Sequence, residues 1–395
     1  MGRNDKHFPR MKILVFNWQD INNPLGGGAE VHLHEIFKRI ASQGHSVTLF
    51  CCSFPGAKAE DWIDGIRVLR QGTRNLFNLS VPSRYRSQFR HEGYDVVVDD
   101  INKIPFYSPW FVREPLVGIM HHFFGKSIFL EASLPAALYV AAAEKLAVRV
   151  YRSTPFAVVS ESTRQEMVEL GFPKENISIV PNCVDHGVYH PADQPPSSAS
   201  VVGHLGRLKK YKSVDHLLRA CQIVRGEMPE VQLKIVGDGD YRPWLEALTH
   251  KLGLTEAVQF TGFLTKDETM RQLHQVSVAV NCSVKEGWGL TVIEANACGV
   301  PVIASDVPGL RDSVVDEKTG LLYEYGNIEQ LAQKILLILR DEHLRNRLRN
   351  GAIAWAQSFN WSDSADRMVD VLRRAIARKK KSYEAEYRGR RAGIR

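Results

Sequence analysis

Apolar residues in the first half of the chain form short runs that alternate with stretches of helical periodicity. The run MKILVFN leads into the turn NPLGGGAE, after which apolar residues recur from Leu33 to Ile40 at the spacing of one helix face. Gly44 ends this helix, and SVTLFCC begins a second strand. The later runs DVVVDD, PLVGIM, FAVVS and ISIVP continue the alternation. This order predicts an α/β domain with a mostly parallel sheet over residues 11–185.

The same alternation restarts in the second half. The stretch PNCVDHGVYHPADQPPSSAS (181–200) holds four prolines and three late serines, so it predicts an interdomain linker. Runs such as VVGHLGRL, VQLKIVGDG and VPVIAS then alternate with helices over residues 199–360, which predicts a second doubly wound α/β domain. A helix (361–380) and a tail (381–395) follow. Two facing domains of this kind place a ligand cleft at the carboxyl ends of both sheets.

Length and composition agree with a two-domain protein. A chain of 395 residues is too long for one hydrophobic core. The start MGRNDKHFPR has no apolar segment typical of a secretory signal, and no apolar run of about 18 residues predicts a membrane span. The nearest candidate, LPAALYVAAAEKLAVRVY, is interrupted by charges and predicts an amphipathic or core-facing helix. Six cysteines without metal-ligand spacing favour a reduced, cytoplasmic protein.

The basic charge of the chain is concentrated at its end. Residues 373–395 carry ten Lys or Arg against two Glu, which exceeds the net charge of +7 of the whole chain. A solvated helix end is one interpretation. The other is peripheral contact with anionic lipid on the inner face of a membrane, which we favour because the basic residues end the chain. No aromatic and basic groove suggests nucleic acid, so no nucleic-acid partner is expected.

Two loops at predicted strand ends could bind phosphate. Gly27 and Gly28 stand at the mouth of the first helix, where backbone amides and the helix dipole attract anions. Plain turn glycines are an equally good interpretation of this loop taken alone, and GGGAEV fits a dinucleotide fingerprint poorly. In GRLKKYK, Arg207 offers a bidentate fork and Lys212 a point charge, which together could neutralise a diphosphate. A solvated basic surface is the alternative.

A third loop, EGWGLTVIE, has a carboxylate at each end. Thr291 and Glu294 fit a capping box, which would explain Glu294 but not Glu286. If the amides of Leu290 and Thr291 instead bind phosphate at the helix start, with Gly289 allowing a close approach, both acids can accept hydrogen bonds from paired hydroxyls.

A histidine pair, IMHH, marks a fourth strand end. His121 follows the run PLVGIM directly, and a hydrogen-bonded loop histidine is the plainer interpretation of such a position. The sequence DGD (238–240) reads as a tight turn rather than a metal site, and no metal or other cofactor is expected.

Taken together, these motifs resemble those of a known enzyme family. GGGAE, the strand-end His121, GRLKKYK, VGDG, GF at 262–263, and Glu286 and Glu294 followed by ACGVPVIASDVPGLRD resemble the retaining family-4 glycosyltransferases of the GT-B fold. The resemblance covers residues 11–370. It implies two Rossmann-like domains, an acceptor bound mainly by the first, a nucleotide-sugar donor bound mainly by the second, and a final helix that crosses back to the first domain.

The resemblance also implies roles for single residues. Arg207 and Lys212 would bind the donor diphosphate, Glu294 the ribose, and Glu286 the hydroxyls of the transferred sugar. The remaining implied contacts are His121 with the sugar near the reaction centre, the amides of Gly27, Gly28, Gly289, Leu290 and Thr291 with phosphate, and Phe263 and Leu264 with the base. The adjacent His122 leaves the choice of histidine open. The sequence departs from the family pattern at Trp288, after the Glu-Gly pair, and at Ser213, where glycine is common.

The resulting expectation is a hexosyltransferase. It would move a hexose from a UDP- or GDP-linked donor to an acceptor hydroxyl with retention, in glycolipid or polysaccharide synthesis. No residue is an evident nucleophile for double displacement. The family resemblance implies front-face attack instead. A lipid-linked acceptor is a hypothesis that rests on the basic tail and on residues 123–152. The alternatives are a catalytically silent binding module of the same fold, a nucleotide-sugar epimerase and a phosphorylase.

Overall fold

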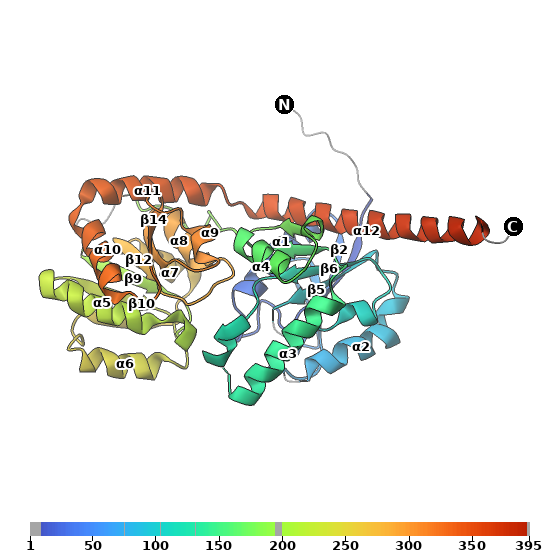
Figure 1. Ribbon diagram of the computed structural model, residues 1–395, viewed down its shortest axis with the longest axis horizontal. Coiled ribbons are helices and arrows are strands. Elements are labelled where there is room, and N and C mark those ends of the chain that lie inside the picture. The colour runs from blue at the N-terminus through green and yellow to red at the C-terminus, as the bar shows by residue number, and fades with distance from the viewer. Residues whose placement is uncertain (1–8, 75, 103, 131, 194–199, 393–395) are drawn as a thin grey trace, which may run out of the picture.

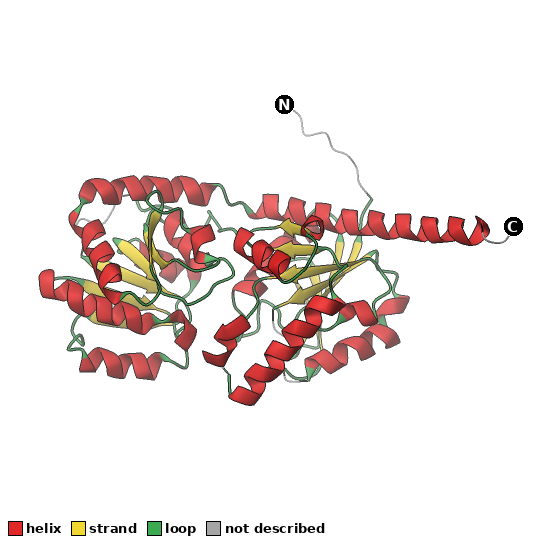
Figure 2. Ribbon diagram, viewed as in Figure 1, coloured by secondary structure: helices red, strands yellow, loops and turns green. Residues whose placement is uncertain are grey.

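The computed structural model describes residues 9–392, except 75, 103, 131 and 194–199. Two lobes, each a mostly or wholly parallel sheet covered by helices, lie side by side, and the last helix runs along the first lobe and projects beyond it (Figures 1 and 2).

The first sheet contains eight strands, and all but one pair are parallel. Their order across the sheet is β3 (Glu60–Ile63), β4 (Ile66–Arg70), β2 (Ser46–Cys51), β1 (Lys12–Phe16), β5 (Val96–Ile101), β6 (Leu116–Met120), β7 (Phe156–Val158) and β8 (Ile177–Ile179). The exception is β3, which pairs antiparallel with β4 at the edge. The associated helices are α1 (Gly28–Ser42), α2 (Phe77–Ser87), α3 (Leu134–Val150) and α4 (Glu161–Glu169).

Alternate residues of β1 pack on opposite faces of this sheet, as the two-residue period of a strand requires. Ile13 and Val15 join the core formed with α1 and with α12 (Trp361–Ala392), whereas Leu14 and Phe16 join the core under α2. Burial on both faces explains why this strand reads as an uninterrupted apolar run.

The second sheet is entirely parallel. Its order is β11 (Val258–Gly262), β10 (Gln232–Val236), β9 (Val201–Leu205), β12 (Val278–Asn281), β13 (Val302–Ser305) and β14 (Gly320–Tyr323). The helices of this lobe are α5 (Val214–Glu227), α6 (Arg242–Lys251), α7 (Lys266–Leu273), α8 (Leu290–Ala297), α9 (Leu310–Ser313), α10 (Ile328–Arg340) and α11 (Glu342–Gln357). The predicted pair of doubly wound α/β domains is therefore confirmed.

Helix α12 and the segment before β9 join the two lobes. The helix does not end near residue 380 but continues to Ala392, and its first half is apolar where it meets the first sheet, as at Met368 and Leu372. The described first part of the predicted linker packs into the core. Residues 194–199 lie outside the described part, whereas Cys183 and Tyr189 are buried in the core that the lobes share.

Helix α3 faces the core along one side, as predicted, but its other side is less polar than expected. It buries Ala137, Ala143 and Ala147 against the lobe. Leu134 and Leu138 are 64% and 56% exposed, so the helix presents large apolar side chains to solvent.

Candidate active site

The loops that follow β1 and β9 meet where the lobes face each other. A Cβ atom at Gly27 would lie 3.0 Å from Nη2 of Arg207, and one at Gly28 would lie 3.1 Å from Cδ1 of Leu290. Gly27 has extended dihedrals, so space rather than backbone strain makes glycine suitable there. The structure thus brings together the predicted glycine loop, the predicted basic loop and the start of α8.

Two further bonds join the lobes close to this point. Lys285, in the loop after β12, pairs with Glu166 of α4 through Nζ and Oε1, 2.7 Å apart. The backbone amide of Ser162 donates to Oδ2 of Asp312 at 3.1 Å. The segments that follow β12 and β13 are therefore held against the first lobe by charge and hydrogen bonding.

A largely buried ion pair joins two of the predicted donor-binding residues. Lys212 Nζ donates to Oε1 of Glu286, and their side chains are 13% and 14% exposed. Ser283 Oγ also donates to this oxygen at 2.7 Å. Burial opposes both charges, but the pairing outweighs it, so the pKa of Glu286 is lowered and the pKa of Lys212 is raised. Both groups are charged at neutral pH, and the ammonium is held in place before any ligand arrives.

The basic loop needs an unusual backbone conformation directly after Lys212. Ser213, which departs from the family pattern, has a φ of 48° and therefore occupies the left-handed region that favours glycine. Its hydroxyl lies 3.0 Å from the Tyr325 hydroxyl, a contact that offsets part of the conformational cost. Arg207 is exposed at the other end of the loop.

The capping-box interpretation of Thr291 and Glu294 is wrong. Helix α8 begins at Leu290 with Gly289 at its N-cap, and no side-chain hydrogen bond caps it. Gly289 has a φ of 93°, which explains the need for glycine at this turn. The amides of Leu290 and Thr291 lie in the first turn, where backbone N–H groups lack an intrahelical acceptor.

Glu294 lies one turn into α8 and is partly buried. Burial raises its pKa to about 7, although Lys266 and a hydrogen bond with Tyr189 act in the opposite direction. Tyr189 is 5% exposed, and burial together with Glu294 raises its own pKa. Glu294 is therefore poised to change its charge near neutral pH. Tyr189 was not predicted as a site residue, because its segment has the composition of a linker.

The two strand-end histidines face different surroundings. His121 is 6% exposed, and its Nε2 lies 2.9 Å from Oδ1 of Asp100, at the end of β5. Its ring meets that of His32 edge-on at 5.2 Å. His122 is partly exposed, and its Nδ1 would lie 3.4 Å from a Cβ at Gly287 in the opposite lobe. The sequence signal for Asp100 was the pair of acids that ends the otherwise apolar run VVVDD.

The glycine loop already holds a carboxylate. The Gly27 amide donates to Oε2 of Glu30 at 2.7 Å, and Asn102 Nδ2 donates to Oε1 at 2.9 Å. Glu30 is 5% exposed. A phosphate could use the Gly27 amide only by displacing this carboxylate, so Gly28 is the better placed of the two predicted glycines.

The predicted base-binding residues lie after β11. Phe263 is 85% exposed, an unusual position for a large aromatic side chain, whereas Leu264 packs against the shared core. An exposed ring at a strand end offers a flat apolar surface on which a base could stack. Trp288, in contrast, is 6% exposed and meets Phe359 edge-on, so it belongs to the core.

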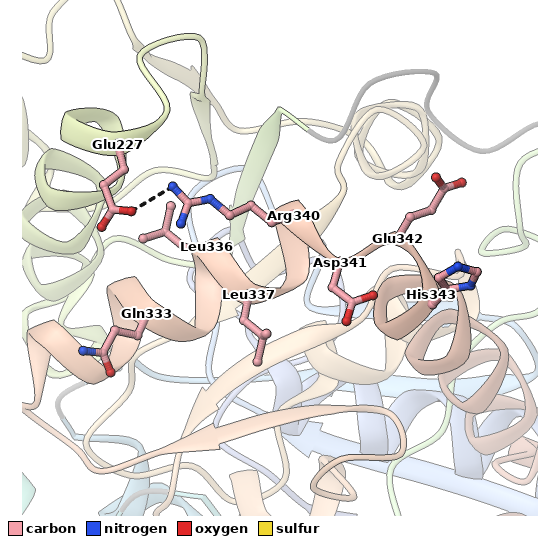
Figure 3. A pocket seen from close by; sticks show the side chains of 8 residues that line it. All are labelled: Glu227, Gln333, Leu336, Leu337, Arg340, Asp341, Glu342 and His343. Carbon is pink, nitrogen blue, oxygen red and sulfur yellow. Dashed lines mark hydrogen bonds and ion pairs between the residues drawn. The ribbon is translucent and has the colours of Figure 1, made fainter.

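An open hollow of about 730 Å³ lies elsewhere on the second lobe. Figure 3 shows it between the ends of α5 and α10 and the start of α11, with Arg340 paired to Glu227 at 2.8 Å. Both side chains of this pair are about half exposed, and none of the predicted site residues lines the hollow. The predicted site residues lie at the lobe boundary instead.

Two kinds of feature, a metal-binding cluster and a membrane-spanning helix, are absent from the described residues. Within them, no group of three or more His, Cys, Asp or Glu side chains is arranged to hold a metal ion. None of the helices in this part of the chain is both long and apolar enough to cross a membrane.

Two family models match adjacent parts of the chain. Glycosyltransferase Family 4 matches residues 26–188, and Glycosyl transferases group 1 matches residues 189–355. The D-inositol 3-phosphate glycosyltransferase of Stackebrandtia nassauensis is 32% identical over 222 residues, or 52% of this chain and 50% of the relative. The alignment with this relative therefore spans about half its length.

Solved structures share the fold over nearly the whole chain. Sucrose-phosphate synthase from Thermosynechococcus elongatus has a TM-score of 0.79 at 22% identity, covering 93% of this chain and 100% of that chain. Anabaena Alr3699/HepE in complex with UDP-glucose has a TM-score of 0.70 at 22% identity, covering 94% and 100%. At such identities the likeness is one of fold.

Proposed function

The chain belongs to the family-4 glycosyltransferases of the GT-B fold, and from this membership we propose that it transfers a hexose from a nucleotide diphosphate sugar to an acceptor hydroxyl with retention. The observation that carries the proposal is the largely buried pair of Lys212 and Glu286 at the lobe boundary. Lys212 lies in the same loop as Arg207, and Glu286 lies in the loop that leads into α8. A cation and a carboxylate held side by side suit a ligand that presents phosphate next to sugar hydroxyls.

The donor would lie along the second lobe. Arg207, Lys212 and the first amides of α8 bind the diphosphate, Glu294 accepts from the ribose hydroxyls, and Glu286 accepts from the hexose hydroxyls. The base lies at Phe263 and Leu264. A uracil nucleotide is supported by the Anabaena neighbour, which is in complex with UDP-glucose, and a GDP-linked donor is the second candidate.

The reaction would proceed by front-face attack. The acceptor oxygen forms a bond to the anomeric carbon on the face from which the diphosphate leaves, so the configuration is retained. The electron pair of the broken carbon–oxygen bond stays on the leaving phosphate, and that phosphate takes the acceptor's proton. Arg207, Lys212 and the α8 amides stabilise the negative charge as it develops, which is the largest contribution we assign to the protein. These cations would make a metal unnecessary.

Substitution of Lys212 tests this assignment. We expect Lys212→Ala to lower turnover at least about a hundredfold, the effect of losing a preorganised charge at the leaving group. Lys209→Ala is the matched control, because Lys209 lies in the same loop and pairs instead with the exposed Asp240, so we expect turnover within about twofold of wild type. The assay measures donor consumption and product anomer by NMR, with and without EDTA.

A folding defect must be separated from the loss of chemistry. Lys212→Ala leaves Glu286 buried without its cation, which is destabilising, so the double variant with Glu286→Gln should recover the thermal midpoint but not turnover. Near-normal turnover in Lys212→Ala would contradict the proposal. Product formed without acceptor would indicate an epimerase, dependence on orthophosphate a phosphorylase, and nucleotide binding without turnover the silent module.

The acceptor proposal has two candidate classes. The name of the Stackebrandtia relative supports a phosphorylated cyclitol. A lipid-linked acceptor is supported by the exposed leucines of α3 and by the exposed basic residues near the end of α12, which together would place the first lobe close to an anionic membrane.

A further inference from the structure

The N-terminus of helix α4, in the first lobe, is completed by a side chain of the second lobe. The Ser160 hydroxyl caps the helix by accepting from the Thr163 amide at 3.1 Å. The Ser162 amide lies in the same first turn, where it has no intrahelical acceptor. It donates instead to Oδ2 of Asp312, at 3.1 Å across the lobe boundary. A carboxylate at this end of a helix also complements the positive end of the helix dipole.

A second contact between the lobes lies one turn further along α4. Ser162 and Glu166 are four residues apart, so they lie on the same face of the helix. Glu166 Oε1 is 2.7 Å from Nζ of Lys285, and both side chains are partly buried. Each lobe thus contributes one negative and one positive partner. We call these two contacts, Ser162 with Asp312 and Glu166 with Lys285, the α4 clamp.

Lys285 also lies near a second acidic group of the first lobe. Its Nζ would be 4.0 Å from a Cβ at Gly125, which begins the short helix η3 after β6. Glu144 of α3 accepts from the Gly125 amide at 3.1 Å. Burial raises the pKa of Glu144, while its backbone hydrogen bonds and the charge of Lys285 oppose the rise. The cation is therefore attracted to the first lobe by the carboxylates of Glu166 and Glu144.

Both second-lobe members of the α4 clamp adjoin Glu286. Lys285 directly precedes it in the chain. Asp312 lies in α9, shortly after Gly309, and a Cβ at Gly309 would be 2.2 Å from the carbonyl oxygen of Glu286. The Glu286 amide in turn donates to the Pro308 carbonyl at 3.4 Å. The α4 clamp therefore holds the first lobe against the backbone of the loop that carries Glu286.

We propose that Glu166, Lys285 and Asp312 are positioning residues, which lock α4 onto the Glu286 loop and so set the distance between the transferred sugar and an acceptor on the first lobe. The proposal rests on the proposed transferase function, in which Glu286 accepts from the hexose hydroxyls. The three side chains act through the backbone and through the lobes that they join. Because the donor lies along the second lobe, loss of the clamp should impair transfer and spare donor binding.

Hydrogen exchange of the Ser162 amide tests the α4 clamp without any substrate. Asp312 is the acceptor of this amide, so its exchange reports separation of the lobes at this point. Glu166→Lys leaves that bond in place but turns the neighbouring ion pair into a repulsion. If the two contacts act together, Ser162 should exchange at least about threefold faster in this variant than in wild type. Glu169→Lys is the matched control on the same helix, because Glu169 is exposed and accepts from Gln165 of α4 itself, and it should leave the exchange unchanged.

Kinetics with UDP-glucose and D-inositol 3-phosphate as probe substrates supply the functional readout. Glu166→Lys should lower kcat at least about tenfold, while the Kd for UDP stays within about twofold of wild type. The double variant with Lys285→Glu again places opposite charges at the lobe boundary. Its kcat should therefore exceed that of both single variants.

The proposal is overturned if Ser162 exchanges equally fast in Glu166→Lys and Glu169→Lys. It is also overturned if Glu166→Lys lowers the thermal midpoint but leaves the kcat of the folded enzyme unchanged, because the ion pair would then be merely structural. Failure of wild type to turn over the probe substrates would instead contradict the substrates of the proposed function. The exchange comparison then decides the α4 clamp by itself.

Discussion

At the scale of single residues, Glu294 gives the clearest pH dependence. Its pKa of about 7 in the folded protein lies above the ordinary carboxyl value, because burial disfavours the charged form. Ribose hydroxyls donate best to the ionised carboxylate, so UDP should bind more tightly as the pH rises through 7. We expect the Kd for UDP, measured by calorimetry, to be roughly tenfold lower at pH 8 than at pH 6.

Glu294→Gln provides the control for this prediction. The variant cannot ionise at position 294, so its UDP affinity should be weaker and should change with pH only as the nucleotide itself titrates. The raised pKa also means that ionisation destabilises the fold. The free energy of unfolding of wild type should therefore fall relative to Glu294→Gln between about pH 4.5 and 7, and stay level above that window. If the UDP affinities of the two proteins changed in parallel with pH, Glu294 would not be part of the ribose site.

The sequence predicted the chemical roles of the candidate site residues better than it predicted the directions of their side chains. The motifs picked out Lys212 and Glu286 as charged partners of a ligand, and the structure adds that they bind each other. The sequence could not give the directions of the His121 and His122 side chains, because both follow the same strand and differ only in which neighbours they meet. It also could not show that Glu30 occupies the Gly27 amide, because that contact depends on how α1 begins.

At the scale of elements, the close approach of the β1 loop to the β9 loop can be tested at Gly27. A methyl group there would lie 3.0 Å from Nη2 of Arg207, so the guanidinium of this exposed, flexible side chain would have to move. We expect Gly27→Ala to raise the donor KM about tenfold with little change in the thermal midpoint, since the backbone at Gly27 is extended.

The matched control for this prediction is Gly226→Ala. Gly226 lies in α5, where an added Cβ meets open space, so alanine should raise stability slightly and leave the donor KM unchanged. If Gly27→Ala also left the donor KM unchanged, the displaced guanidinium would not be part of the donor site.

Elements with strong periodicity followed the sequence, and those set by tertiary contacts did not. The parallel strands are buried on both faces, so their apolar runs were legible. The antiparallel strand β3 was missed, although Asp64 and Gly65, both at positive φ, form the turn that joins it to β4. Helix α12 continued past its predicted end because a basic composition alone does not stop a helix.

At the scale of the whole molecule, the two lobes are joined by a shared core as well as by the site. Val292 and Ile293 of α8 belong to the same buried cluster as Ile13 of β1 and Met368 of α12. The shared core could not be predicted from the sequence, because it is formed by segments from both ends of the chain. Apolar packing behind the site therefore connects the predicted donor loops with the strands of the first lobe.

The projecting end of α12 carries the last prediction, contact with an anionic membrane. Lysines 379–381 are exposed, and Tyr383 is 72% exposed beside them. Basic residues near such a surface contribute about 1 kcal/mol each, so changing all three lysines to Glu should lower binding to phosphatidylglycerol vesicles at least about a hundredfold. Flotation measures this, and the binding should weaken with salt.

The control places the same charge change on the second lobe, at the exposed Lys251, Lys318 and Arg347. Substitution is preferable to truncation within α12, because Leu372 and Ala375 belong to the core and their loss would disturb the fold. A weaker interaction in the α12 variant alone would mean that the helix end docks the enzyme, with the first lobe and its α3 leucines next to the lipid. Equal weakening in both variants would mean that net charge, rather than this helix, governs the interaction, and the case for a lipid-linked acceptor would then rest on α3 alone.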